Sequence, residues 1–261
     1  MDGGRHRTYR HGVLQTPVAS LVCNFTPGVD GAPALLTHDD VTTLFHEFGH
    51  TLHHVLTAQT ESGVSGINGV EWDAVELPSQ FLENFAWDRE VVKSITSHVE
   101  TGEPLPDALF EKMLAAKNFL AGAACVRQVE FALFDMLLHT SFSPDRDDIR
   151  ALLADVRREV AVVFPPEYDR FPQSFAHIFA GGYAAGYYSY KWSEVLSCDC
   201  FEAFEETGIR NPETGRRFLT EILERGSSRD AMENFVAFRG RKPELGALLR
   251  LTGIVETTAA K

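Results

Sequence analysis

The residues whose types and spacing suit chemistry best are the two histidines and the glutamate of HEFGH, residues 46–50. Apolar residues recur at helical spacing in the surrounding run TLFHEFGHTLHHVL, which predicts a helix over residues 40–57. In a helix, His46 and His50 lie about one turn apart on one face, so their imidazoles can bind one metal ion. Glu47 stays outside the ligand set and can act as a general base toward a water that the metal activates. This is the division of roles behind the HExxH motif.

A third ligand must come from elsewhere in the chain, because catalytic zinc usually takes three protein ligands and keeps one position open. The candidate is Glu76, 26 positions after the motif, while Glu71 and Asp73 compete with it on spacing alone. Pro78 is tolerated only near the first turn of a helix, so a second helix is predicted to begin between residues 73 and 77. Glu76 then lies at the N-terminal end of this helix, where it can point toward a metal on the neighbouring one.

Other polar side chains near these candidates are expected to support them. Glu83 lies two turns further along the second helix, where it can accept a hydrogen bond from a ligand histidine or lie in solvent. His53 and His54 are expected to be structural or to contact the ligands. His50 and His54 are also four residues apart, but Thr51 follows His50, so a motif shifted by one turn lacks its glutamate base.

A second candidate stretch, residues 171–196, combines glycines with tyrosines in FPQSFAHIFAGGYAAGYYSYKWSEVL. Gly181, Gly182 and Gly186 make its middle deformable, and its tyrosines offer phenolic hydrogen-bond donors. Hydrolysis of an amide builds negative charge on the carbonyl oxygen, and a donor aimed at this oxygen stabilises the transition state. The residues alone leave a second interpretation open, in which the tyrosines form an aromatic packing stripe.

Composition and charge exclude several classes of protein. The 261 residues carry a formal net charge of −13, which argues against a nucleic-acid partner because such a partner calls for a basic face. No apolar run approaches the ~20 residues that cross a bilayer, and the first residues lack a secretory signal, so a cytoplasmic location is expected. The cysteines are too few and too irregular for a disulfide scaffold and are expected to be reduced thiols. They are Cys23, Cys125, Cys198 and Cys200.

Length and periodicity predict a mainly helical chain with one large domain. The predicted parts are a flexible segment over residues 1–14, the main domain over 15–256 and a tail over 257–261. Residues 18–25 and 34–36 are predicted to be strands. The glycine-punctuated residues 59–69 are predicted to form a loop that either closes over substrate or connects two helices.

Residues 89–164 and those after residue 198 are predicted to be helical scaffold. Within the first of these segments, Arg127 and His139 are the polar residues that we consider for contact with the site. Residues 239–243, RGRKP, are predicted to form a basic turn that is either solvated or meets a substrate carboxylate.

Three motifs, taken in order, resemble those of one known family. HEFGH, VELPSQFLENF and HIFAGGYAAGYYSYKWSEVL are similar to motifs of the thimet oligopeptidase and oligopeptidase A family of zinc metallopeptidases, nearer to its bacterial oligopeptidase A branch. The resemblance runs from about Gln15 to Ile254. Members of this family are considerably longer, so the chain looks like their C-terminal, zinc-bearing part.

The resemblance implies a mainly α, helical zincin-type metallopeptidase domain with a small β-sheet beside the active-site cleft. It implies one Zn²⁺ per chain and selects Glu76 over its competitors as the third ligand. The site residues that it implies are, as metal ligands, His46, His50 and Glu76; as catalytic residues, Glu47, Tyr190, Tyr183 and His177; and, for substrate binding, Tyr187.

The predicted function is therefore that of a zinc-dependent endopeptidase, an oligopeptidase that hydrolyses short peptides with metal-activated water and a glutamate general base. The alternative is a zinc-binding but catalytically impaired fragment that lacks the N-terminal wall of the substrate channel. In that case an apolar surface normally covered by the N-terminal portion would favour self-association.

Overall fold

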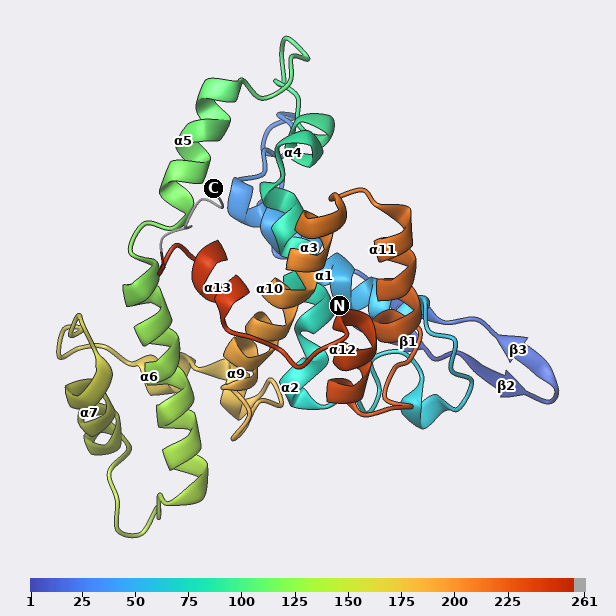
Figure 1. Ribbon diagram of the computed structural model, residues 1–261. Coiled ribbons are helices and arrows are strands. Elements are labelled where there is room, and N and C mark those ends of the chain that lie inside the picture. The colour runs from blue at the N-terminus through green and yellow to red at the C-terminus, as the bar shows by residue number, and fades with distance from the viewer. Residues whose placement is uncertain (256–261) are drawn as a thin grey trace.

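The computed structural model describes residues 1–255 and shows a mainly α-helical chain, which confirms the predicted fold class (Figure 1). The predicted tail, residues 257–261, lies outside the described residues. The strands form two separate antiparallel pairs. The first pairs β1 (Asp2–Arg5) with β4 (Val18–Ser20), and the second pairs β2 (Thr8–Arg10) with β3 (Val13–Gln15).

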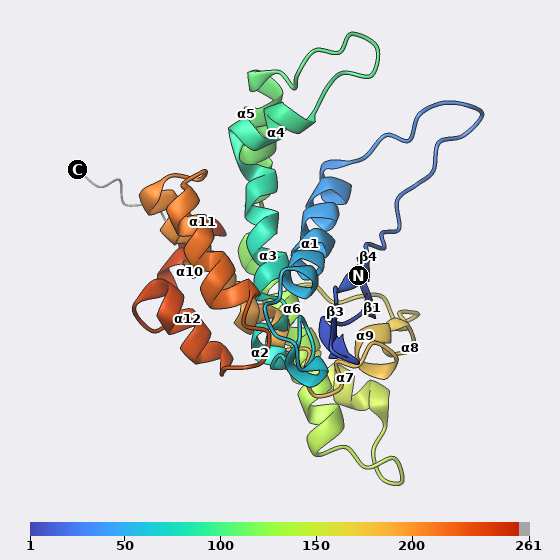
Figure 2. The ribbon, with the colours of Figure 1, turned by 90° about the vertical axis from the view of Figure 1, so that its right-hand side faces the viewer.

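The N-terminal strands differ from the sequence-based expectation. Residues 1–14, predicted to be flexible, carry β1, β2 and most of β3, because their main chains pair with each other and with β4. The predicted strand over residues 18–25 ends at Ser20, where Asp2, the first residue of β1, is its partner. Residues 34–36 form no strand. Figure 2 shows the segment between β4 and the first helix as a long extended loop.

The helices follow this N-terminal segment. The first group comprises α1 (His38–Val55), a 3₁₀ turn (Ser62–Val64), α2 (Trp72–Val75), α3 (Leu77–Glu83) and a second 3₁₀ turn (Asn84–Trp87). The second group comprises α4 (Arg89–Ile95), α5 (Asp107–Lys117), α6 (Ala121–Thr140) and α7 (Ile149–Val160). The third comprises α8 (Phe171–Ser174), α9 (Ala176–Phe179), α10 (Ser189–Thr207), α11 (Pro212–Phe218), a π-helical turn (Leu219–Leu223), α12 (Ala231–Arg239) and α13 (Gly246–Leu251). Figure 1 shows α5, α6 and α7 along one side, while α1, α3 and α10 pack together at the centre.

Local sequence explains where α1 begins. The Thr37 hydroxyl accepts a hydrogen bond from the amide of Asp40 at 3.2 Å, and the Asp40 carboxylate accepts one from the Thr37 amide at 2.8 Å. This capping box satisfies amide groups that lack a partner within the helix, and the acidic first turn complements the helix dipole. The helix therefore begins and ends two residues earlier than predicted.

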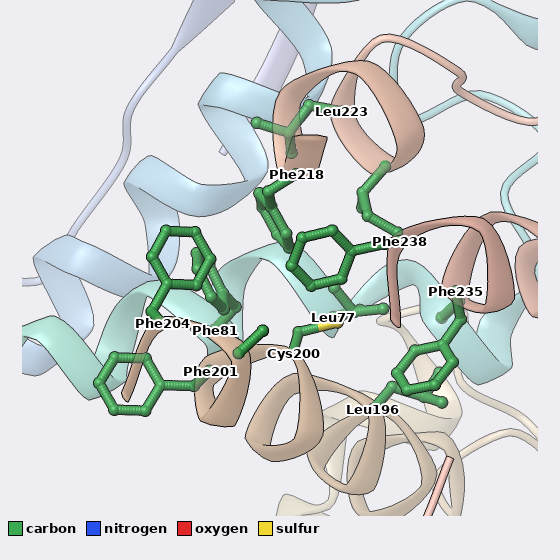
Figure 3. Packing of buried hydrophobic residues seen from close by; sticks show 13 residues of the cluster. Leu77, Phe81, Leu196, Cys200, Phe201, Phe204, Phe218, Leu223, Phe235 and Phe238 are labelled. Carbon is green, nitrogen blue, oxygen red and sulfur yellow. The ribbon is translucent and has the colours of Figure 1, made fainter. Parts of the chain in front are cut away.

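The predicted start of the second helix is confirmed, with Pro78 in the first turn of α3. From α3, the buried side chain of Phe81 enters a cluster of aromatic rings contributed by α10, α11 and α12 (Figure 3). Its ring stacks on Phe218 with centroids 4.1 Å apart. The cluster fixes α3 against the C-terminal helices, because burial of these rings contributes the largest apolar areas of this core.

A close approach of α1 and α3 depends on Gly49. A Cβ atom at this position would lie 2.4 Å from the carbonyl oxygen of Pro78 and 2.5 Å from the Cα atom of Ser79. Any larger residue would push the two backbones apart. The glycine of HEFGH therefore sets the distance at which α3 lies from the motif histidines.

The basic turn near residue 240 is solvated only in part: Gly240 and Lys242 are exposed, while two of its arginines bind a buried acid. Arg239 is 6% exposed and donates to the buried carboxylate of Asp199 at 2.7 Å, and Arg241 binds the same carboxylate at 2.6 and 2.8 Å. The turn thus neutralises a buried acid of α10. The neighbouring cysteines of α10, Cys198 and Cys200, are buried free thiols, which agrees with the predicted reduced state.

Candidate metal centre

The three predicted metal ligands lie together between α1 and α3. Glu76 Oε2 lies 3.3 Å from His46 Nε2 and 3.1 Å from His50 Nε2. Zinc bonds of about 2.0–2.2 Å in a tetrahedron separate neighbouring ligand atoms by roughly 3.4 Å. The donor types and their spacing therefore fit a zinc ion, and this is the one such cluster within residues 1–255.

The electrostatics of the cluster favour a charged carboxylate. Burial by itself raises the pKa of Glu76, but hydrogen bonds from His46 and His50 outweigh it and hold this pKa well below its usual range. Burial likewise lowers the pKa of His46, yet the carboxylates of Glu76 and Glu83 raise it to about 10. The raised pKa favours a proton on His46 beside the Glu76 carboxylate. A divalent ion would replace that proton, because a metal ligand histidine must be neutral.

The carboxylate of Glu76 is held in one orientation by two hydroxyl groups. Ser79 donates to Oε2 at 2.9 Å, and Tyr183 donates to Oε1. Burial raises the pKa of Tyr183, and the adjacent carboxylate raises it further, so its hydroxyl stays protonated and remains a donor. Oε2 is left facing both imidazoles.

Glu83 contacts the other side of the same centre. Its Oε1 atom lies 2.6 Å from His46 Nδ1, the ring nitrogen that faces away from Glu76. This contact fixes the ring orientation and leaves Nε2 free to bind a metal, as hydrogen-bonded carboxylates do at other histidine ligands. Of the two alternatives left open for Glu83, the structure shows the hydrogen bond.

The neighbouring histidines and acids lie outside the ligand cluster. His54 Nε2 lies 2.9 Å from the carbonyl oxygen of Arg5, and burial lowers the pKa of His53 to about 3, so its ring is neutral. The two competitors for the third ligand also have other partners. Glu71 accepts from the amide of Ala231 at 3.0 Å, and Asp73 accepts from the hydroxyl of Tyr188 at 2.5 Å.

Two clefts meet at Tyr190. The first, of about 630 Å³, is lined by the three candidate ligands together with Glu47, Tyr183 and Tyr190. In this cleft the Glu47 carboxylate contacts the amino group of Met1. The second cleft, of about 580 Å³, is lined by His177, Tyr187 and Tyr190 among others. The tyrosine stretch is thus divided between the metal cleft and its neighbour.

The tyrosines pack in a fixed order beside the metal candidates. The rings of Tyr183 and Tyr190 stack with centroids 4.8 Å apart, and Trp72 of α2 covers Tyr183 at 4.5 Å. The His177 ring lies 5.7 Å from that of Tyr187 and 6.0 Å from that of Tyr190. Tyr183 and Tyr190 therefore reach the metal cleft, while His177 and Tyr187 do not line it.

The chain is similar to known proteins over almost its whole length. The profile of Peptidase family M3 matches residues 1–254. The chain belongs to Peptidase family M3. This confirms the resemblance found in the three motifs.

Several curated relatives of this M3 chain are oligopeptidases by name. Oligopeptidase A of Escherichia coli (strain K12) is 58% identical over 244 residues, which cover 93% of this chain and 36% of that protein. Oligopeptidase A of Haemophilus influenzae is 55% identical, again over 36% of its length, and a probable cytosolic oligopeptidase A of Arabidopsis thaliana is 48% identical. The chain thus spans about a third of the length of these relatives.

A solved structure supports the fold of the M3 chain. It is described as an oligoendopeptidase F from Bacillus anthracis str. Ames, and it aligns with a TM-score of 0.53 at 14% identity. The alignment covers 84% of this chain and 34% of that one. Within residues 1–255, the M3 chain has no helix that is both long and apolar enough to span a membrane.

Some residues around the site were not predicted from the sequence. Gln80 donates from Nε2 to the carbonyl oxygen of Tyr190 at 3.0 Å and thereby joins α3 to α10. Asp135 of α6 accepts from the amides of Ala185 and Tyr187, both at 2.9 Å. The only local signal for Asp135 is a single acid inside the apolar run FALFDMLL.

The loop over residues 59–69 connects α1 to α2, which is one of its two predicted roles, and it lines the metal cleft. Its end, residues 67–69, lines the metal cleft with Val70. The loop is also tied to the far end of the chain, because the Ser227 hydroxyl donates to the carbonyl oxygen of Asn68 at 2.8 Å and its amide donates to that of Val64 at 3.3 Å. It forms a fixed wall of the cleft as well as a connection.

Proposed function

We propose that this M3 chain forms the catalytic part of a zinc-dependent endopeptidase that hydrolyses short peptides. One observation carries the proposal: two histidines and a glutamate converge on one point, with a further glutamate in the same cleft that is not a ligand. The names of the relatives support peptide hydrolysis, and the length of peptide is proposed from them. The proposed catalytic region spans residues 15–256.

In the proposed centre, His46, His50 and Glu76 hold one zinc ion per chain. Bound there, zinc would supply Lewis acidity, which polarises the scissile carbonyl and lowers the pKa of a water molecule. Glu47 takes the proton from the attacking water and delivers it to the leaving nitrogen. Glu83 keeps the ring of His46 in place through its Nδ1 contact.

The tyrosines stabilise charge and hold the peptide. Tyr190 lies between the two clefts, so its hydroxyl can donate to the carbonyl oxygen as negative charge develops there. Tyr183 assists, and through its hydrogen bond it also orients the Glu76 carboxylate. We propose that Tyr187 and His177 contact the peptide in the second cleft, which would let the substrate extend to either side of Tyr190.

Other parts of the expected biology stay predictions. These are a cytoplasmic location and self-association through a surface normally covered by an N-terminal portion. The comparisons give no support to the alternative of an impaired fragment.

The test is hydrolysis of a quenched fluorescent peptide by the purified chain, with and without a chelator, alongside Glu47→Gln. We expect the chelator to abolish turnover and readded zinc to restore it. Because general base catalysis contributes about 10²–10⁴-fold, Glu47→Gln should lower kcat by that factor while the bound zinc per chain stays unchanged.

Glu213→Gln serves as the matched control, since Glu213 is exposed in the first turn of α11 and does not line the metal cleft. It should leave both turnover and zinc content unchanged. Activity that survives chelation, or a Glu47→Gln variant as fast as the parent, would contradict the proposal. Bound zinc without any turnover would contradict it as well.

A further inference from the structure

The tyrosine segment, residues 180–188 between α9 and α10, bears Tyr183 and Tyr187 and leads into Tyr190 in the first turn of α10. It has no helix or strand of its own. Within it, Ala185 has φ of +56° and Gly182 has φ of +85°. A residue with a side chain seldom adopts such a conformation, and it persists only where the surroundings hold it. Contacts from outside the segment must therefore fix the path of the chain from Tyr183 to Tyr190.

The carboxylate of Asp135 supplies these contacts. Its Oδ1 accepts from the amide of Ala185 and its Oδ2 from the amide of Tyr187, each at 2.9 Å, so that it spans the strained residue. His139 Nδ1 lies 2.8 Å from Oδ1 and 2.9 Å from the main-chain carbonyl oxygen of Asp135. Both oxygens are thus engaged, and Asp135 joins the α6 helix to the tyrosine segment through the amides of Ala185 and Tyr187.

The burial of Asp135 makes this arrangement unusual. Its side chain has no exposed surface, and within the described part of the chain neither arginine nor lysine forms an ion pair with it. A buried carboxylate without such a partner is costly unless hydrogen bonds satisfy it. Here the amides of the tyrosine segment provide that compensation, so the acid and the segment stabilise each other.

We propose that Asp135 is a positioning residue, which fixes the tyrosine segment and thereby places Tyr183 and Tyr190 over the metal cleft. Its catalytic consequence rests on the proposed function, whereas its effect on the segment does not. His139 completes the arrangement by orienting the carboxylate from the solvent side of α6.

Glu130 offers a matched control on the same helix. It is also buried, but its carboxylate binds Arg127, and it binds Arg157 at 2.8 Å, without touching the tyrosine segment. Glu130→Gln therefore removes a buried charge from α6 and leaves the segment's amide contacts intact. An effect that the Asp135 and Glu130 variants share reports a general loss of stability. Only an effect that is larger in the Asp135 variants reports positioning of the tyrosine segment.

The first experiment measures amide hydrogen exchange in Asp135→Asn, Asp135→Ala and Glu130→Gln. In Asp135→Ala we expect the amides of Ala185 and Tyr187 both to exchange at least about 10-fold faster than in the parent, because each loses its buried acceptor. In Asp135→Asn at least one of the two amides should do so, because the asparagine side chain keeps a single acceptor oxygen. Glu130→Gln should leave both rates within about 2-fold of the parent. Unchanged exchange at both amides in a folded Asp135→Asn protein would overturn the proposal.

The second experiment measures peptide hydrolysis and coupling to Tyr190. A misplacement of about 1 Å costs roughly 100-fold in rate, so Asp135→Ala should lower kcat by about that factor and change KM by less than about 3-fold. Zinc content should stay at one ion per chain. In a Tyr190→Phe protein, Asp135→Ala should lower kcat by a much smaller factor, because the Tyr190 hydroxyl that Asp135 positions is already absent.

If Asp135→Ala lowers kcat by the same factor in the parent and in Tyr190→Phe, Asp135 does not act through the position of Tyr190. Asp135→Asn keeps the shape of the side chain and one acceptor oxygen, so it serves if Asp135→Ala fails to fold. Should the parent chain lack peptidase activity, the proposed function fails, while hydrogen exchange still decides whether Asp135 holds the segment.

Discussion

Replacement of Gly49 by alanine tests how the structure brings the third ligand to the histidines. The added Cβ atom would lie 2.4 Å from the carbonyl oxygen of Pro78, about 1 Å short of the 3.4 Å at which ordinary contact begins. The atoms that it would meet are backbone atoms of α3, which cannot rotate away as a side chain can. We therefore expect α1 and α3 to separate by about 1 Å at this point.

The separation is large on the scale of a metal site. Ligand distances must agree with their ideal values within about 0.2 Å. Glu76 is the N-cap residue of α3 and moves with it, while both histidines lie on α1. Gly49→Ala should weaken zinc binding by more than the 10–100-fold typical for loss of a hydrogen bond to a ligand. Its free energy of unfolding without metal should change less, because overpacking costs about 1–3 kcal/mol and the better helix propensity of alanine returns about 1 kcal/mol.

The assay is a competition titration against a chromophoric chelator, which gives the Kd for zinc, together with urea unfolding of the metal-free protein. Gly122→Ala is the matched control, because it lies in α6 and an added Cβ there meets nothing within 4 Å. The control should bind zinc like the parent. If Gly49→Ala also binds zinc with the parent's Kd, the close approach of the two helices does not position Glu76, and the reasoning fails.

Three further predictions follow from contacts in and around the site. Glu83→Gln should weaken zinc binding by about 10-fold, which is the lower end of the usual range because the Glu83 side chain is 34% exposed. The control Glu194→Gln, in the second cleft, should leave zinc binding unchanged. Equal Kd values for zinc in Glu83→Gln and the parent would refute the role of Glu83. Burial lowers the pKa of His53 to about 3, below its unfolded value near 6.5, so the unfolded state gains the proton first as the pH falls. The metal-free parent should therefore lose up to about 1.4 kcal/mol of unfolding free energy per pH unit as the pH falls from 6.5 to 3. In urea unfolding, the free energy of His53→Gln should fall less steeply with pH. Identical pH profiles of the two proteins would contradict this. Phe81→Ala removes a ring that is 3% exposed and should lower the free energy of unfolding by about 3–5 kcal/mol, so a loss below 1 kcal/mol in urea unfolding would show that the aromatic cluster does not fix α3.

Features that depend on neighbours in the chain were predictable. The four-residue spacing of His46 and His50 places both rings on one face of any α-helix, and the structure has that helix. Thr37 and Asp40 mark its start, and Pro78 marks the first turn of α3. Each of these depends on local backbone geometry, which a few consecutive residues determine.

Resemblance to a family supplied what spacing could not. On spacing alone, Glu71 and Asp73 competed with Glu76, and only the similarity of VELPSQFLENF to a known motif selected among them. In the structure the choice follows from packing, since Glu71 caps α12 and Asp73 binds Tyr188. The roles assigned to the site residues stay predictions until the variants are measured.

The tertiary structure decided the features that join distant segments. Residues 1–14 form strands because β4 and β3 lie beside them. The side chain of Arg239 is buried because it pairs with the buried carboxylate of Asp199. Asp135 meets the tyrosine segment across about 50 residues of sequence. The sequence by itself determined the helical face that carries the two histidines. How near Glu76 comes to that face depends on the distance between the packed backbones of α1 and α3. Gly49 permits a short distance, but only the assembled core establishes it.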